Sequence, residues 1–112
     1  MKKYEALFIL NPEISDEEAQ GIISRLKSII EGQKGEVLKV EDWGKRRLAY
    51  KIQKHSKGHY FLMHFNGNSG LTSEIERFLR FNESVMRFII VKATKDSDVS
   101  PPEEHEEVEE GE

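Results

Sequence analysis

The sequence contains no cysteine among its 112 residues, only three prolines, and no long apolar run. The missing cysteine excludes a disulfide framework, thiol catalysis and any zinc or iron–sulfur site with cysteine ligands. No stretch approaches the roughly 18 consecutive apolar residues of a membrane-spanning helix. The N-terminal segment already has an acidic residue at Glu5 and lacks a small-residue cleavage site, so a secretory signal is not expected. With 37% apolar residues, the chain is expected to form one cytoplasmic domain with a modest core.

Charge is distributed unevenly along the chain. Residues 96–112 carry nine of the 21 acidic residues and none of the 17 basic ones, which leaves residues 1–95 with 17 basic and 12 acidic side chains, a net charge of +5. Residues 96–112 also have too few apolar side chains to offset the entropy cost of ordering them. We therefore expect a folded basic domain over residues 1–95 and a disordered acidic tail over residues 96–112. A basic body indicates a polyanionic partner.

Periodicity in the folded part predicts an alternation of strands and helices. Strands are predicted over residues 4–10, 60–65 and 85–92; the second strand starts at 37–40 and 48–52 is extended too, with a turn at 57–58 and a loop at 66–70. A first helix should begin after Ser15, which has Glu18 at capping-box spacing, and a second helix should contain Leu71 to Leu79. The order β-α-β-β-α-β is that of an α+β, ferredoxin-like split βαβ fold. This fold has a four-stranded antiparallel sheet with two helices on one face.

Strand alternation assigns the two faces of this sheet. The parity that carries Glu5, His64 and Arg87 should point away from the helices, because an unpaired buried charge is costly. The core side then contains Ala6, Phe8, Leu10, Phe61, Met63, Phe65, Phe88 and Ile90. The opposite face is also apolar, which is typical of a protein-binding surface, although part-exposed strand residues of no function are the alternative. Its candidate partner-binding residues are Leu7, Ile9, Tyr60, Leu62, Ile89 and Val91.

Basic residues concentrate in the predicted hairpin, where Trp43, Tyr50 and Tyr60 are interleaved with them. Cations at this density can neutralise phosphates, and aromatic planes can stack on exposed bases. The alternative is a solvated sheet edge protected from pairing by its lysines. The candidate RNA-binding residues are Lys2, Lys3, Lys45, Arg46, Arg47, Lys51, Lys54, Arg87 and Lys92.

No enzyme, cofactor or metal site is predicted. The sequence has no phosphate-binding glycine loop and no zinc-protease motif. His55 and His59 lie four residues apart, about 13 Å on an extended segment, which is too far for one metal ion unless a turn at Lys57-Gly58 brings them closer. Residues 7–11 and 57–62 are similar to the strand signatures of the RNA-recognition motif. However, Phe8 and Phe61 have core parity and could not stack on bases, so we interpret this match as coincidence.

Three segments together resemble one known family. Met1–Glu5, the hairpin segment Glu41–Ile52 with its Gly-Lys-Arg-Arg-Leu-Ala-Tyr run, and Arg80–Arg87 are similar to the bacterial ribosomal protein S6 family of the small subunit. The resemblance covers residues 1 to about 95 and implies a ferredoxin-like fold without catalysis.

The resemblance also implies partners. Members of this family join ribosomal protein S18 and bind with it to the central domain of 16S ribosomal RNA. The apolar sheet face would then receive S18, and the basic residues would approach the RNA. A small-molecule-sensing regulatory domain is the alternative function, because fold alone does not decide function.

Overall fold

The computed structural model describes residues 2–52 and 54–93, so the predicted acidic tail lies outside the described residues. The elements confirm the predicted β-α-β-β-α-β order. They are β1 (Lys2–Leu10), α1 (Asp16–Gly32), β2 (Glu36–Ile52), β3 (His55–Gly67), α2 (Ser69–Phe81) and β4 (Val85–Lys92). Neither described helix is long and apolar enough to cross a membrane.

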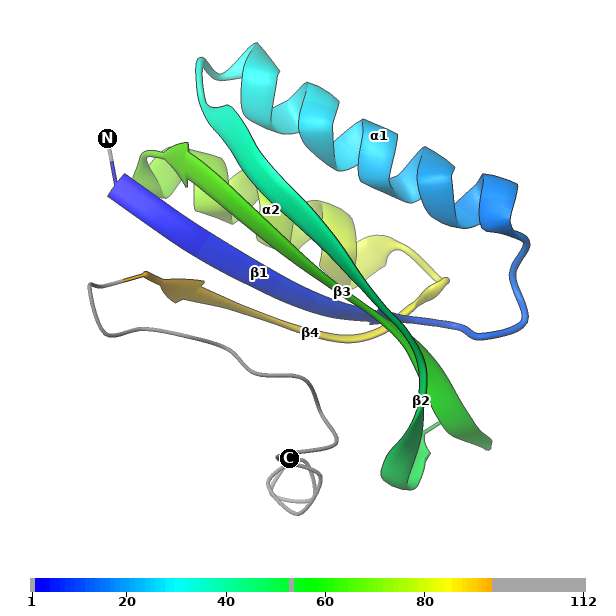
Figure 1. Ribbon diagram of the computed structural model, residues 1–112. Helices are drawn as coiled ribbons and strands as arrows, with labels where there is room; N and C mark the ends of the chain where they lie inside the picture. Colours follow the sequence, from blue (N-terminus) through cyan, green and yellow to red (C-terminus); the bar gives the residue numbers. More distant parts are fainter. Residues whose placement is uncertain (1, 53, 94–112) are drawn as a thin grey trace.

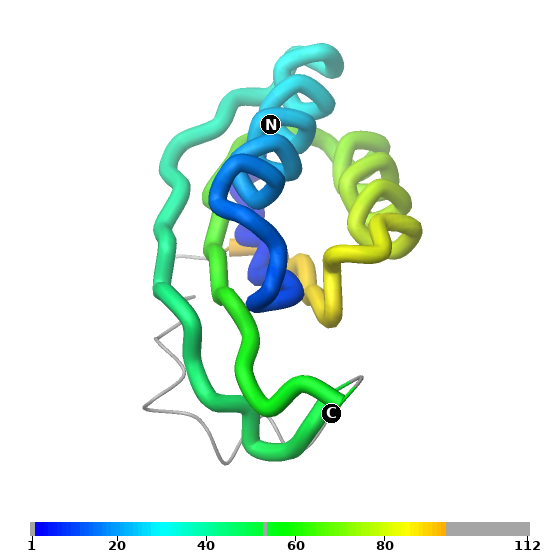
Figure 2. The backbone as a smooth tube through the Cα atoms, turned by 90° about the vertical axis from the view of Figure 1, so that its right-hand side faces the viewer, coloured from blue at the N-terminus to red at the C-terminus, as the bar shows by residue number. Residues whose placement is uncertain are grey.

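The four strands form one antiparallel sheet in the order β2-β3-β1-β4, with both helices on the same face (Figure 1). The first strand is therefore central, between β3 and β4, whereas β2 and β4 are the edges. Seen from the side, α1 and α2 lie next to each other over the sheet (Figure 2). This leaves the other face of the sheet without a helical cover.

The main core lies between the sheet and the helices, and it confirms the predicted face assignment. All eight predicted strand residues belong to it, with Phe88 and Ile90 partly buried and the other six buried. Phe8 and Phe61 are 0% and 1% exposed and stack with their ring centroids 5.6 Å apart. These two aromatics are inside the core, as expected from their parity, and the similarity to the RNA-recognition motif therefore has no binding consequence.

Local side-chain caps explain where the helices begin. The Oγ of Ser15 accepts a hydrogen bond from the Glu18 backbone N–H at 3.0 Å, as the capping box predicts. The Glu18 carboxylate in turn accepts a hydrogen bond from Ser84 Oγ at 2.9 Å, which ties the start of α1 to the segment before β4. Asn68 caps α2 in the same way, by accepting from the Leu71 backbone N–H at 2.9 Å. The predicted loop over residues 66–70 is thus wrong, since Asn68 alone separates β3 from α2.

The β2–β3 hairpin is longer than predicted, because the segments predicted at residues 37–40 and 48–52 belong to a single strand of 17 residues. Its register shifts near Gly44, which has φ of +81° and whose N–H bonds to Asp42 Oδ1 at 2.8 Å. Such an irregularity bends a strand and increases its twist. β2 ends at Ile52 and β3 begins at His55, so the turn predicted at Lys57-Gly58 is wrong and both residues lie inside β3.

Candidate protein- and RNA-binding surfaces

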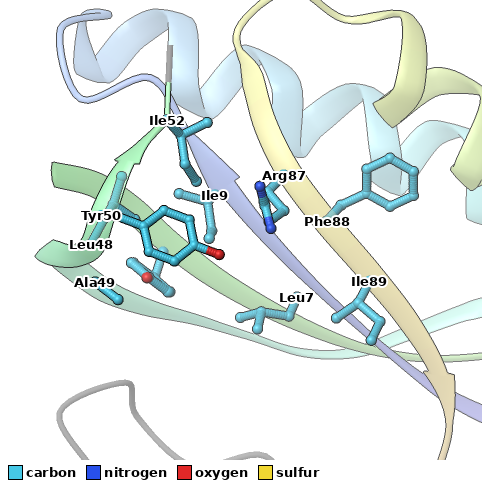
Figure 3. Close-up of a pocket in the computed structure, with 10 residues that line it drawn as sticks. Leu7, Ile9, Leu48, Ala49, Tyr50, Ile52, Arg87, Phe88 and Ile89 are labelled. Atoms are coloured by element: carbon cyan, nitrogen blue, oxygen red, sulfur yellow. The ribbon is translucent and has the colours of Figure 1, made fainter. Parts of the chain in front are cut away.

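The bent end of the β2–β3 hairpin folds back over the sheet face that the helices leave uncovered. Between the hairpin and this face is a cavity of about 470 Å³, which we call the sheet groove. In Figure 3, Leu48, Tyr50 and Ile52 of the hairpin face residues of β1 and β4. The groove is lined by Leu7, Ile9, Leu48, Ala49, Tyr50, Ile52, Tyr60, Arg87, Phe88 and Ile89.

Four of the six predicted partner-binding residues line this groove, but the expectation of a fully open apolar face is wrong. Tyr60 and Leu62 are each 1% exposed and Ile9 is 7% exposed. Leu7 and Val91 are half-buried, and only Ile89, at 55%, is widely exposed. Leu62 and Val91 do not line the groove. The accessible part of the predicted surface is therefore centred on β4 rather than on β3.

A second small core explains this burial. Ile9, Leu48 and Tyr60 form a buried cluster, against which Trp43 and Ile52 pack. The hairpin approaches β1 closely because Gly58 has no side chain: a Cβ there would collide with Cγ2 of Ile9. Strand alternation identified the face correctly but did not show that the chain's own hairpin covers part of it.

His64 lies between two carboxylates on the same face. Its Nε2 is 2.8 Å from Glu41 Oε2, and its Nδ1 is 3.4 Å from Glu5 Oε2. Trp43 Nε1 donates to Glu41 Oε1 at 3.0 Å, and this hydrogen bond, together with the one to His64, lowers the pKa of Glu41 against the opposing effect of burial. Glu5 was expected on this face because a buried charge is costly. It does lie on this face, but it is only 5% exposed and has His64 as its ion-pair partner.

His55 and His59, the other two histidines that the structure describes, each lie close to one carboxylate. His59 Nε2 is 2.8 Å from Asp42 Oδ1, and His55 is 3.9 Å from Glu13. Burial raises the pKa of Asp42, but the hydrogen bonds from His59 and the Gly44 N–H outweigh it and the pKa is lowered. Within the described part of the chain, no three His, Asp or Glu residues are arranged to hold a metal ion.

The nine candidate RNA-binding cations do not form one patch. Lys2 and Lys92 are neighbours at one end of the sheet, where contact with the Lys2 ammonium and its charge lower the pKa of Lys92. Lys45 is opposite His59 in the sheet, and His59 is opposite Leu10 at the far end of β1. Leu10 lies about 26 Å from Lys2 along β1, at about 3.3 Å per residue, so Lys45 is far from the Lys2 end. The cations at the Lys2 end are Lys2, Lys3 and Lys92, and those on the hairpin are Lys45, Arg46, Arg47, Lys51 and Lys54.

Two arginines in this set have additional contacts. Arg46 Nε donates to the Trp43 backbone oxygen at 2.9 Å, which holds the guanidinium against the bent segment of β2. Arg87 lies on the edge strand β4 and lines the sheet groove (Figure 3). The exposed side chains Lys45 and Arg47 are therefore better candidates for phosphate contacts than Arg46.

These features define a class of protein before any comparison. The structure is a small α+β domain with an apolar groove on its sheet and exposed cations at the Lys2 end of the sheet and on the hairpin. An apolar groove with cations nearby is typical of proteins that bind macromolecules.

Comparison with known proteins identifies the family. The family model for ribosomal protein S6 matches residues 3–92, and the chain belongs to this family. It is 41% identical over 97 residues to small ribosomal subunit protein bS6 of Geotalea daltonii, covering 87% of this chain and 76% of the relative. It is 43% identical over 95 residues to that of Clostridium novyi, covering 85% and 100%.

A solved structure agrees with this assignment. The crystal structure of 30S ribosomal protein S6 from Thermotoga maritima superposes with a TM-score of 0.77 at 33% identity, covering 82% of this chain and 87% of that one. Membership in the family makes the chain a structural protein of the small ribosomal subunit, with a role in translation and a cytoplasmic location on the ribosome.

Proposed function

We propose that this protein binds the central domain of 16S ribosomal RNA, in the platform of the small subunit, as a heterodimer with ribosomal protein S18 and without catalysing a reaction. The observation that carries the proposal is the sheet groove: an S6-family domain presents an apolar cavity of about 470 Å³ beside an isoleucine that is 55% exposed. A protein partner would bury this surface.

In this proposal the groove and the cations have separate tasks. Apolar side chains of S18 enter the sheet groove next to Ile89, and the hairpin holds its far wall in place through Leu48. Lys45 and Arg47 remain exposed at the hairpin and contact phosphates, while Lys2 and Lys92 provide a second positive region. The salt dependence of RNA affinity should therefore follow from the cations, and its dependence on S18 should follow from the groove.

Salt dependence tests the phosphate contacts. The affinity of the full chain with S18 for a 16S central-domain fragment should fall steeply with salt, and Arg47→Ala should reduce the slope of log K against log salt by about 0.9 if it removes one contact. Lys27→Ala, an exposed cation on α1, is the matched control and should leave the slope unchanged. An unchanged slope in Arg47→Ala would show that this residue does not contact phosphate.

The small-molecule-sensing alternative rests on the same groove, whose volume lies in the range of ligand pockets, about 300–1,000 Å³. Family membership favours the ribosomal function. Recovery of the native protein from cells with S18 would support the heterodimer. Recovery free of ribosomal components, with a small molecule bound, would support the alternative.

A further inference from the structure

A second hollow lies in the helical layer, away from the sheet groove. We call it the interhelix groove. It has a volume of about 420 Å³ and lies between α1 and the C-terminal half of α2, which are neighbours in Figure 2. An adjoining hollow continues it along α1, where Gly21 has no side chain and Ser24 and Ser28 have small ones. The interhelix groove is lined by Arg25, Ile29, Glu74, Arg77, Phe78, Phe81 and Asn82.

An aromatic ring stands at the end of this groove. Phe81 is 75% exposed, more than any other large hydrophobic side chain among the described residues. Phe78, one turn before it, instead packs against the main core. The α2 helix therefore places one aromatic ring partly buried against the core and a second, three residues later, in solvent. An exposed planar ring can stack on a nucleobase without rearrangement of the protein.

The groove also holds two arginines that have no counter-ion among the described residues. Neither Arg25 nor Arg77 has a side-chain hydrogen bond or ion pair with any residue in the ranges 2–52 and 54–93. Arg80 differs, since it pairs with Glu76 and its guanidinium lies 6.0 Å from the centroid of Phe88. Glu74 is the single carboxylate in the lining, so the groove has a positive balance.

We propose that the interhelix groove binds one unpaired nucleotide of RNA, with the base stacked on Phe81 and the phosphate held by Arg25 and Arg77. The positive balance selects a polyanion, and the exposed ring favours a nucleobase over an acidic peptide, which has no plane to stack. The C-terminal carbonyls of α2 are negative, so the two guanidiniums must provide the attraction for phosphate. The choice of RNA rests on the proposed function, but this site lies on the helical face, away from the surface assigned to S18.

The experiment is an NMR titration of the ¹⁵N-labelled full chain with a single-stranded uridine hexanucleotide. The largest changes should occur at the Nε–H signals of Arg25 and Arg77. Phe81→Ala should weaken binding at least fivefold, which corresponds to about 1 kcal/mol, the lower limit for stacking of a base on an aromatic side chain. Phe81→Leu, which stays apolar but has no ring, should weaken it similarly. Arg77→Gln should lower the salt slope by about 0.7.

Two matched controls separate this site from the others. Lys27→Gln removes a cation of α1 that does not line the groove, and Ile89→Asp alters only the sheet groove. Both should leave hexanucleotide binding within twofold. Because binding is read without S18 or ribosomal RNA, a failure of the proposed heterodimer would not affect it. Thermal unfolding of each variant checks that it is folded. The Phe81 variants should remain folded, because this side chain is 75% exposed.

Three results would overturn the proposal. The first is an affinity unchanged in both Phe81 variants. The second is a set of shifted signals confined to the hairpin or the Lys2 end. The third is binding of a hexaglutamate peptide as tight as that of the hexanucleotide and insensitive to Phe81→Ala, which would make the groove an acidic-peptide site instead.

Discussion

Replacing Ile89 with aspartate tests the sheet groove directly. Ile89 is 55% exposed. For a side chain of this size this is roughly 100 Å² of mostly apolar area, and its burial by a partner contributes about 2.5 kcal/mol at about 25 cal/mol per Å². The loss of this contribution corresponds to about 70-fold in affinity, and the need to desolvate a carboxylate adds to it. We therefore expect the variant to bind S18 at least about 50-fold more weakly.

The assay is calorimetric titration of the full chain with purified S18, together with thermal unfolding of each variant alone. Ile89→Asp should unfold near the wild-type temperature, because an exposed substitution changes stability by about 0.5 kcal/mol or less. Leu38→Asp is the matched control: Leu38 is 41% exposed but does not line the groove. An S18 affinity within twofold of wild type in Ile89→Asp would refute the proposed interface. Leu62→Asp is not a suitable probe, since Leu62 is 1% exposed and the variant should unfold.

Three further predictions concern stability. Gly58→Ala should destabilise the protein by about 1–3 kcal/mol in urea unfolding, because the new Cβ collides with Ile9; a neutral effect would show that the hairpin can move outward freely. Ser15→Ala should cost about 1 kcal/mol by removing the cap of α1, and wild-type stability would contradict the capping role. Because the folded-state pKa of Glu41 is lowered, its contribution to stability should be present above its ordinary pKa of 4.5 and disappear as the pH falls through the lowered value. Trp43→Phe removes the main cause of this shift, so the loss of stability in acid should become smaller, as measured by circular dichroism.

Much of the fold could be predicted because each strand alternates cleanly and each helix has one apolar stripe. The core membership of Phe8 and Phe61 follows from parity alone, and the start of α1 follows from Ser15 and its side-chain acceptor. These are local properties, set by residues two to four positions apart in the sequence.

The errors have a common physical cause. Gly58 was predicted to form a turn, but its lack of a side chain makes room for Ile9, a contact between strands that sequence spacing does not reveal. The burial of Tyr60 likewise depends on Leu48, which lies twelve residues away in the sequence and packs in the same cluster. The interhelix groove was missed because Arg25 and Arg77 come from different helices, and no short motif contains both.

The central place of β1 in the sheet has a consequence for the order of events during synthesis. β1, which is synthesised before the other three strands of this sheet, hydrogen-bonds to β3 on one side and to β4 on the other, up to Lys92. Its second edge therefore stays unpaired until nearly the whole domain has left the exit tunnel. Folding of the nascent chain can finish only at that stage, and contacts this distant in sequence make the final step slow relative to helix formation.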